Sequence, residues 1–138
     1  MKVELKRIDN NYHLEGKGIS NIPVNIDGSE KIGGSNSGAR PMELVLMALG
    51  SCGAIDIINI LKKQRQEPDE FKVEISGNRD PDNIPSVFTD IKVEFIFAGN
   101  LDRSKVSKAV ELSMDKYCSV LSMLKNSVKI TYSFKINS

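Results

Sequence analysis

The chain has 138 residues, a length that suits one compact domain, and we expect that domain to span residues 1–138. The 19 Lys and Arg residues nearly balance the 18 Asp and Glu residues, and no basic stripe with interleaved aromatic residues predicts a nucleic-acid partner. Two cysteines and one histidine are too few for a four-ligand zinc site without carboxylates, so no metal is expected.

The N-terminal third predicts a small antiparallel meander. Three strands are expected, over residues 2–8, residues 12–16 and the alternating residues 22–26. A loop rich in Gly and Ser follows at residues 33–39, and it lacks the pattern of a phosphate-binding loop. The opening residues are charged rather than apolar, so we expect no secretory signal and a cytoplasmic protein, in a compartment where thiols stay reduced.

A long apolar helix is predicted from Pro41 to about Gln66. Proline is favoured in the first helical turn, Glu43 suits the positive end of the helix dipole, and Pro68 ends the helix. The longest apolar run covers only residues 44–49, so we expect no membrane-spanning helix. Apolar residues nevertheless occupy nearly every face of this helix, and a single chain of this size cannot bury all of those faces. We therefore expect a second copy to cover the helix in an intertwined dimer.

The C-terminal half predicts three further strands and a second helix. The strands cover residues 71–75, 87–97 and 128–136, and the helix lies between the last two, with the stretch from Asn100 to Asp102 offering an N-cap. A short helical or turn segment should separate this helix from the last strand. On one face of the helix lie Val106, Ala109, Val110, Met114 and Tyr117, with Cys118 continuing it. The order β-β-β-α-β-β-α-β predicts an α+β fold.

The two cysteines are the strongest candidates for chemically active residues. Cys52 lies in the apolar helix within "LGSCGAID", and Cys118 lies in "DKYCSVL". A free cysteine is often simply a small buried hydrophobic residue, and that reading stays open beside a redox pair. A neighbouring cation such as Arg40 or Lys116 would favour the reactive thiolate. His13 has no motif partner that would make a Cys-His nucleophile.

The stretches "RPMELVLMALGSC" and "KYCSVLSML" together are similar to the OsmC/Ohr family (osmotically inducible protein C and organic hydroperoxide resistance protein). In that family a proline near the start of the central helix precedes the first cysteine by eleven residues, as Pro41 precedes Cys52 here. The second cysteine follows the later helix, as Cys118 does. The residues of both motifs most resemble those of the YhfA-like branch. The resemblance implies an intertwined homodimer with two antiparallel β-sheets around paired central helices.

The resemblance also implies thiol-dependent reduction of hydroperoxides without a metal or another cofactor. Cys52 would then be the thiolate that attacks the peroxide, and Cys118 would resolve the resulting sulfenic acid as a disulfide. An external dithiol would restore both thiols. The implied partners are a small hydroperoxide or apolar molecule and the reductant, with no membrane involved.

One position departs from the hydroperoxide reductases of the family. They carry a Glu directly after the helix proline, where it helps to hold an activating arginine, whereas this chain has Met42 there and Glu43 one residue later. The candidates for the activating arginine are Arg7 and Arg40. Two hypotheses follow: a two-cysteine hydroperoxide reductase, or a non-catalytic dimer that binds a small apolar ligand or senses oxidants.

Overall fold

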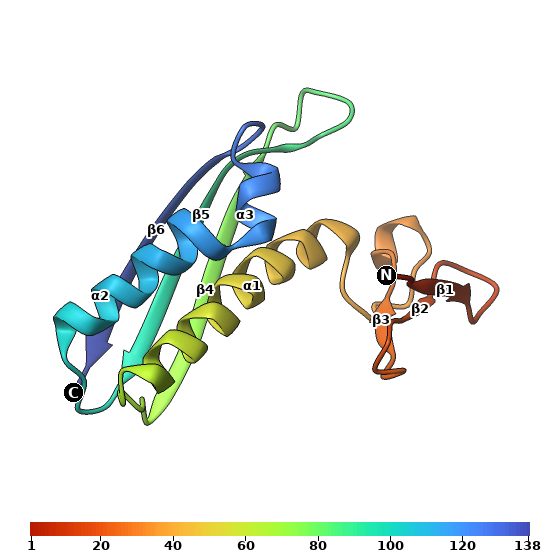
Figure 1. The fold of residues 1–138 in the computed structure, drawn as a ribbon. Helices are drawn as coiled ribbons and strands as arrows, with labels where there is room; N and C mark the ends of the chain where they lie inside the picture. The colour runs from red at the N-terminus through yellow and green to blue at the C-terminus, as the bar shows by residue number, and fades with distance from the viewer. The chain divides into compact units, whose positions relative to one another are not determined.

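The computed structural model describes residues 1–138 and divides into two compact units, Met1–Val45 and Leu46–Ser138. Its α+β element order matches the predicted order, with short helical segments added (Figure 1). In chain order the elements are β1 (Glu4–Arg7), β2 (Leu14–Lys17), β3 (Val24–Ile26), the 3₁₀ helix η1 (Glu30–Ile32), α1 (Pro41–Lys63), β4 (Glu70–Arg79), β5 (Phe88–Ala98), α2 (Arg103–Leu112), the π-helical turn η2 (Ser113–Tyr117), α3 (Ser119–Leu124) and β6 (Lys129–Asn137).

The N-terminal unit is built on an antiparallel sheet with the order β1-β2-β3. Its strands are short, and Gly16 is the one strand residue that is fully buried. Apolar side chains such as Val3, Leu5 and Val24 remain exposed in the single chain. The sheet therefore has almost no core of its own.

The second sheet has the order β4-β5-β6 and differs from the predicted antiparallel sheet in one pairing. Strands β4 and β5 are antiparallel, but β5 and β6 are parallel over the register Asp90↔Lys129 to Ala98↔Asn137. Parallel neighbours require a crossover connection, and the helical segment from α2 to α3 provides it.

The core of the C-terminal unit lies between this sheet and its helices. Figure 1 shows α1 and α2 running across one face of the sheet, while the opposite face carries charged pairs such as Lys72–Glu74. Phe71 stacks on Phe97 with ring centroids 4.5 Å apart. The fully buried side chains that β5 contributes to this core are Ile91, Val93, Phe95 and Phe97.

Helix α1 ends at Lys63, three residues before the predicted end. Arg65 adopts a left-handed conformation with φ of 56°, and the N–H of Gln66 bonds back to the carbonyl of Leu61 at 2.9 Å. These contacts close the helix before Pro68 is reached.

Helix α1 also meets the length and apolar composition of a membrane-spanning helix, which the sequence analysis did not expect. A core helix of a soluble protein passes the same test. Here Leu49, Ile57 and Leu61 are fully buried, so one face of α1 belongs to the core of the C-terminal unit.

Candidate functional site

Cys52 lies at the edge of the buried face of α1 and is half-buried. The helix can lie close to its neighbours there because two glycines face them. A Cβ on Gly50 would clash with Ile75 Cδ1 of β4, and one on Gly53 would lie 3.0 Å from Met114 Sδ and 3.2 Å from Phe95 Cζ. Close packing is thus one reason for glycine at two helical positions that would otherwise favour alanine.

Cys118 follows the π-helical turn η2, which continues α2. The N–H of Cys118 donates to the carbonyl of Ser113 at 2.7 Å, five residues back, and this wider turn rotates the residues after α2. Cys118 faces the core as predicted and is 3% exposed. The prediction that Tyr117 lies on the buried face is wrong. Its side chain is 51% exposed, because the wider turn carries it off that face.

Contacts between α1 and the segment around Cys118 bring the two cysteines together. The Ser113 hydroxyl donates to the buried carbonyl of Gly53 at 2.9 Å, next to Cys52 in the chain. The Cys118 thiol points at the carbonyl of Leu49, one helical turn before Cys52, with an Sγ–O distance of 4.0 Å. The Cys52 thiol is also close enough to the Cys118 thiol to raise its pKa.

The pKa of the Cys118 thiol is raised to about 11, mainly by burial and to a smaller extent by the neighbouring Cys52 thiol. The N–H of Leu121, 3.5 Å from Cys118 Sγ, acts in the opposite direction and lowers this pKa. Cys118 is therefore a neutral thiol at neutral pH.

Ser113 connects the η2 segment to α1 through its hydrogen bond to Gly53, and this role was not predicted from the sequence. The signal was available, because Ser113 is a polar residue between Val110 and Met114 on an otherwise apolar helix face. The sequence analysis also did not single out Asp56, one helical turn after Cys52, whose Oδ2 is buried without a hydrogen-bond partner.

Glu43 and Arg40 interact at the start of α1, within the N-terminal unit. Glu43 Oε1 accepts a hydrogen bond from the backbone N–H of Arg40 at 2.9 Å and so caps the helix. The Arg40 guanidinium donates to the carbonyl of Gly38 at 2.9 Å and to Asn36 Oδ1 at 2.8 Å. Both candidates for activating or orienting residues thus have local structural partners.

Arg7 lies in β1, and its guanidinium binds the turn that follows. Nε donates to the carbonyl of Asn11 at 2.9 Å, and Nη2 donates to the carbonyl of Asn10. A role of Arg7 or Arg40 toward Cys52 remains a prediction.

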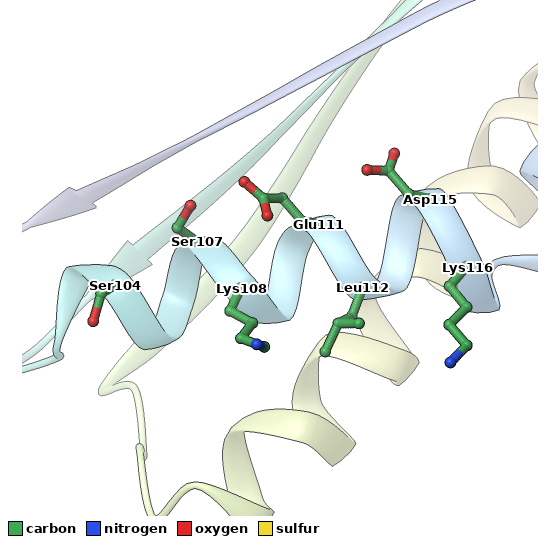
Figure 2. A pocket seen from close by; sticks show the side chains of 7 residues that line it. All are labelled: Ser104, Ser107, Lys108, Glu111, Leu112, Asp115 and Lys116. Carbon is green, nitrogen blue, oxygen red and sulfur yellow. The ribbon is translucent and has the colours of Figure 1, made fainter.

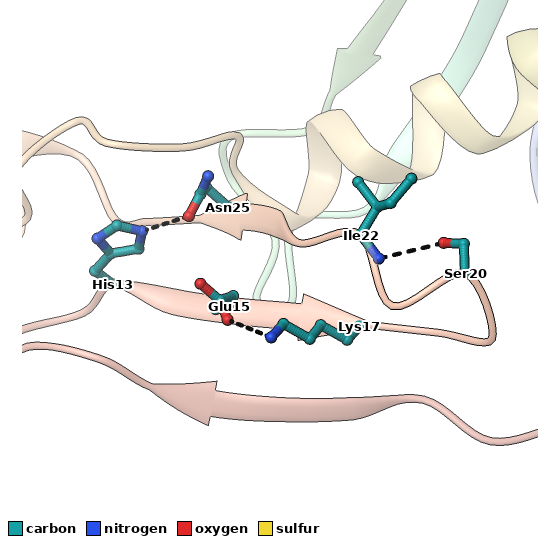
Figure 3. Close-up of polar contacts among 6 residues, drawn as sticks. All are labelled: His13, Glu15, Lys17, Ser20, Ile22 and Asn25. Atoms are coloured by element: carbon teal, nitrogen blue, oxygen red, sulfur yellow. Dashed lines mark hydrogen bonds and ion pairs between the residues drawn. The ribbon is translucent and has the colours of Figure 1, made fainter.

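His13 belongs to the N-terminal sheet, where it is a structural residue. Its Nε2 lies 3.0 Å from Asn25 Oδ1, and the ion pair of Glu15 and Lys17, with a separation of 3.4 Å, lies on the strand that follows (Figure 3). No group of three or more His, Cys, Asp or Glu side chains is arranged to hold a metal ion.

The hollows on the surface do not coincide with the cysteine pair. An open hollow of about 440 Å³ runs along α2, with Lys108 and Lys116 on one side and Glu111 and Asp115 on the other (Figure 2). The complete lining of this hollow is Ser104, Ser107, Lys108, Glu111, Leu112, Asp115 and Lys116. It contains neither thiol and is too open to enclose a small molecule.

Comparison with known proteins agrees with this architecture. The family model for OsmC-like protein matches residues 34–133, which include both cysteines. Protein YhfA of Escherichia coli K12 is 39% identical over 124 residues, covering 87% of this chain and 92% of YhfA.

Two solved structures show the same fold. A hypothetical protein from Aquifex aeolicus VF5 is 32% identical with a TM-score of 0.80, and the match covers 99% of this chain and 97% of that one. An organic hydroperoxide resistance protein OsmC from Legionella pneumophila is 12% identical with a TM-score of 0.67, over 98% of this chain and 97% of that one. With a family model that spans both cysteines and relatives that align over nearly its whole length, the chain belongs to the OsmC-like family.

Proposed function

We propose that the chain reduces organic hydroperoxides, with Cys52 as the attacking thiol and Cys118 as the resolving thiol. One observation carries the proposal: the buried thiol of Cys118 lies against α1 at the carbonyl of Leu49, one helical turn before the half-buried Cys52, and close enough to Cys52 for that thiol to raise its pKa. Cys52 is the more accessible of the two and is therefore the one that a peroxide can reach first. A solved structure of the same fold is an organic hydroperoxide resistance protein, which supports this choice of substrate.

The reaction balances with these two thiols, one hydroperoxide and one external dithiol. The Cys52 thiolate attacks the terminal peroxide oxygen, the O–O bond breaks, and the departing alkoxide takes a proton to become an alcohol. Cys52 is then a sulfenic acid, which condenses with Cys118 to a disulfide and releases water. The dithiol reduces this disulfide by exchange and is itself oxidised to a disulfide.

The neutral state of Cys118 suits a resolving thiol. With a pKa of about 11, Cys118 keeps its proton at neutral pH and does not compete with Cys52 for the peroxide. When its sulfur attacks the sulfenic acid, its proton passes to the hydroxide that leaves Cys52. Both the proton and the leaving group are thus accounted for without a metal.

The proposal includes a homodimer, because the single chain leaves one side of α1 exposed. Met47, Ser51, Ile55 and Ile58 recur at helical spacing on that side and are all exposed. Proteins of the OsmC-like family are generally dimers. A second copy would cover this apolar face, on the side of the helix next to Cys52.

The test follows consumption of cumene hydroperoxide by the reduced chain with dithiothreitol as the external dithiol. The wild type should turn over many times and prefer cumene hydroperoxide to hydrogen peroxide. Cys52→Ser should abolish turnover, while Cys118→Ser should still lose its Cys52 thiol but accumulate sulfenic acid. Turnover that survives Cys52→Ser would contradict the proposal.

A second function is favoured by the contacts at the start of α1: a non-catalytic dimer that binds a small apolar ligand or senses oxidants. Glu43 is occupied as a helix cap, Arg40 is occupied by the loop before it, and Met42 stands where hydroperoxide reductases carry a carboxylate. If this function is correct, peroxide oxidises the thiols once and slowly, and dithiothreitol supports no catalytic turnover.

A further inference from the structure

Cys118 is at once a candidate redox residue and the N-cap of helix α3. Its Sγ accepts a hydrogen bond from the N–H of Leu121 at 3.5 Å, the position at which an N-cap side chain normally satisfies a free backbone donor. The same sulfur donates its proton toward the carbonyl of Leu49 in α1 at 4.0 Å. The reduced thiol therefore connects α3 to α1.

Helix α3 has few other contacts to hold it in place. It has six residues, none of which is fully buried, and Met123 is 81% exposed. A helix of this length is not stable alone, because forming its first turn costs more than one hydrogen bond returns. In Figure 1 it appears as the short segment between η2 and β6. Its order depends on the Cys118 cap and on the backbone bonds that follow it.

A disulfide between Cys52 and Cys118 changes both contacts of the sulfur. The new S–S bond is about 2.05 Å long, shorter than any contact between two thiols, so Sγ of Cys118 must move toward α1. The S–H that donates to Leu49 no longer exists, and the sulfur is held by Cys52 instead of being free to cap the N–H of Leu121. The first turn of α3 then has an unsatisfied backbone donor.

We propose that oxidation of the pair releases helix α3 and thereby opens the Cys118 sulfur to the external dithiol. The inference rests on the proposed function, because that reaction produces the disulfide. In the reduced state Cys118 is 3% exposed, so a dithiol cannot reach its sulfur. Helix α3 thus excludes the reductant while the two cysteines are reduced and admits it once they have formed a disulfide.

Hydrogen–deuterium exchange of the full chain tests this inference. The disulfide is made in two separate samples, one with cumene hydroperoxide and one with diamide, and is verified by non-reducing peptide mapping. In both samples, backbone exchange in peptides covering residues 119–127 should rise about tenfold over the reduced chain. Peptides from β5, whose hydrogen bonds lie within the sheet, should not change.

The two oxidants separate this inference from the proposed function. If diamide gives the disulfide and a released α3 while cumene hydroperoxide gives no disulfide, the reductase fails and the redox release stands. Unchanged or slower exchange of α3 in a verified disulfide overturns the release, and so does a chain in which diamide cannot join the two cysteines.

Two substitutions in the reduced chain test the cap without any disulfide. Cys118→Ser keeps an acceptor for the N–H of Leu121, whereas Cys118→Ala removes it. Exchange of α3 should be roughly fivefold faster in Cys118→Ala than in Cys118→Ser, the factor expected from the loss of one helix cap. Equal exchange in the two variants would show that the sulfur does not hold α3 and would overturn the inference.

Discussion

Cys118 shows how much of the site depends on a single side chain. Its backbone N–H closes the π-helical turn, and its sulfur contacts α1, Cys52 and the first turn of α3. Serine could make most of these hydrogen bonds, and with better geometry for a cap. Under the proposed function, sulfur chemistry rather than hydrogen bonding explains why this position carries cysteine.

The raised pKa of Cys118 predicts slow alkylation in the native chain. At pH 8 a thiol with a pKa of about 11 has about a hundredfold less thiolate than one with the ordinary value of 9.0. Iodoacetamide should therefore modify Cys118 at least that much more slowly in the folded chain than in urea, as measured by timed quenching and peptide mass spectrometry. Equal rates in both states would contradict the burial of this thiol.

The same pKa predicts how Cys118 affects stability in alkali. A thiol whose pKa is raised by folding contributes stability below the unfolded value of 9.0, and this contribution is lost as the pH rises from 9.0 to about 11. The urea midpoint of the wild type should fall over that range more than the midpoint of Cys118→Ser. If the urea midpoints of the two proteins fall in parallel with pH, a group other than Cys118 is responsible for the loss of stability.

Asp27 has a comparable structural role in the N-terminal unit. It is 1% exposed and accepts hydrogen bonds from the N–H groups of Gly28, Ser35 and Ser37, at 2.7 to 3.1 Å. The bond from Ser37 is the largest influence that lowers the pKa of Asp27, and His13 adds a smaller electrostatic effect. The carboxylate thereby fixes the glycine- and serine-rich loop.

Asp27→Asn should release the loop over residues 28–39, because an amide cannot accept all three hydrogen bonds. Limited proteolysis at pH 7 should cut the variant there several-fold faster than the wild type, while the exposed control Asp82→Asn should behave like the wild type. Since the pKa of Asp27 is lowered, the wild-type loop should be protected above about pH 4 and lose protection as the pH falls further. Identical cleavage of the two variants would refute this role.

At the scale of elements, α1 can pack closely against its neighbours because glycines at the contact have no side chain. Gly53 lies against Met114 and Phe95, both of which are fully buried and cannot easily move aside. An alanine would gain about 1 kcal/mol in helix propensity but would lose about 1–3 kcal/mol by overpacking. Overpacking should dominate because the surrounding core is rigid.

Gly53→Ala should therefore lower the free energy of unfolding by about 1 kcal/mol, measured by urea denaturation. Lys108→Ala on α2 is the control, since Lys108 is exposed and its replacement gains propensity without a clash. The control should be as stable as the wild type or slightly more stable. A Gly53→Ala variant that gains stability would mean that Met114 gives way.

The elements that follow a regular hydrophobic period could be predicted from the sequence. Strand β5 alternates over its full length, and Asp102 caps α2 through the N–H groups of Ser104 and Lys105 as expected. The π-helical turn could not be predicted, because it depends on Ser113 bonding to Gly53, sixty residues earlier. That one tertiary contact decides that Cys118, and not Tyr117, faces α1.

At the scale of the whole molecule, the apolar residues that the single chain leaves exposed favour a dimer. Ile55 in α1 is 66% exposed although its helix is otherwise apolar. Ile55→Asp should shift the protein from twice the chain mass to the mass of one chain in light scattering. Ile84→Asp, at a fully exposed turn residue, should leave the mass unchanged. A wild type that is already monomeric would contradict the dimer.

The proposed redox pair is tested most directly by the intact mass of the reduced chain after one equivalent of cumene hydroperoxide. The account predicts that the chain loses the mass of two hydrogen atoms, that peptide mapping joins Cys52 to Cys118, and that dithiothreitol restores the original mass. A chain that keeps both thiols, or that only gains oxygen atoms while Cys118 stays free, would contradict it.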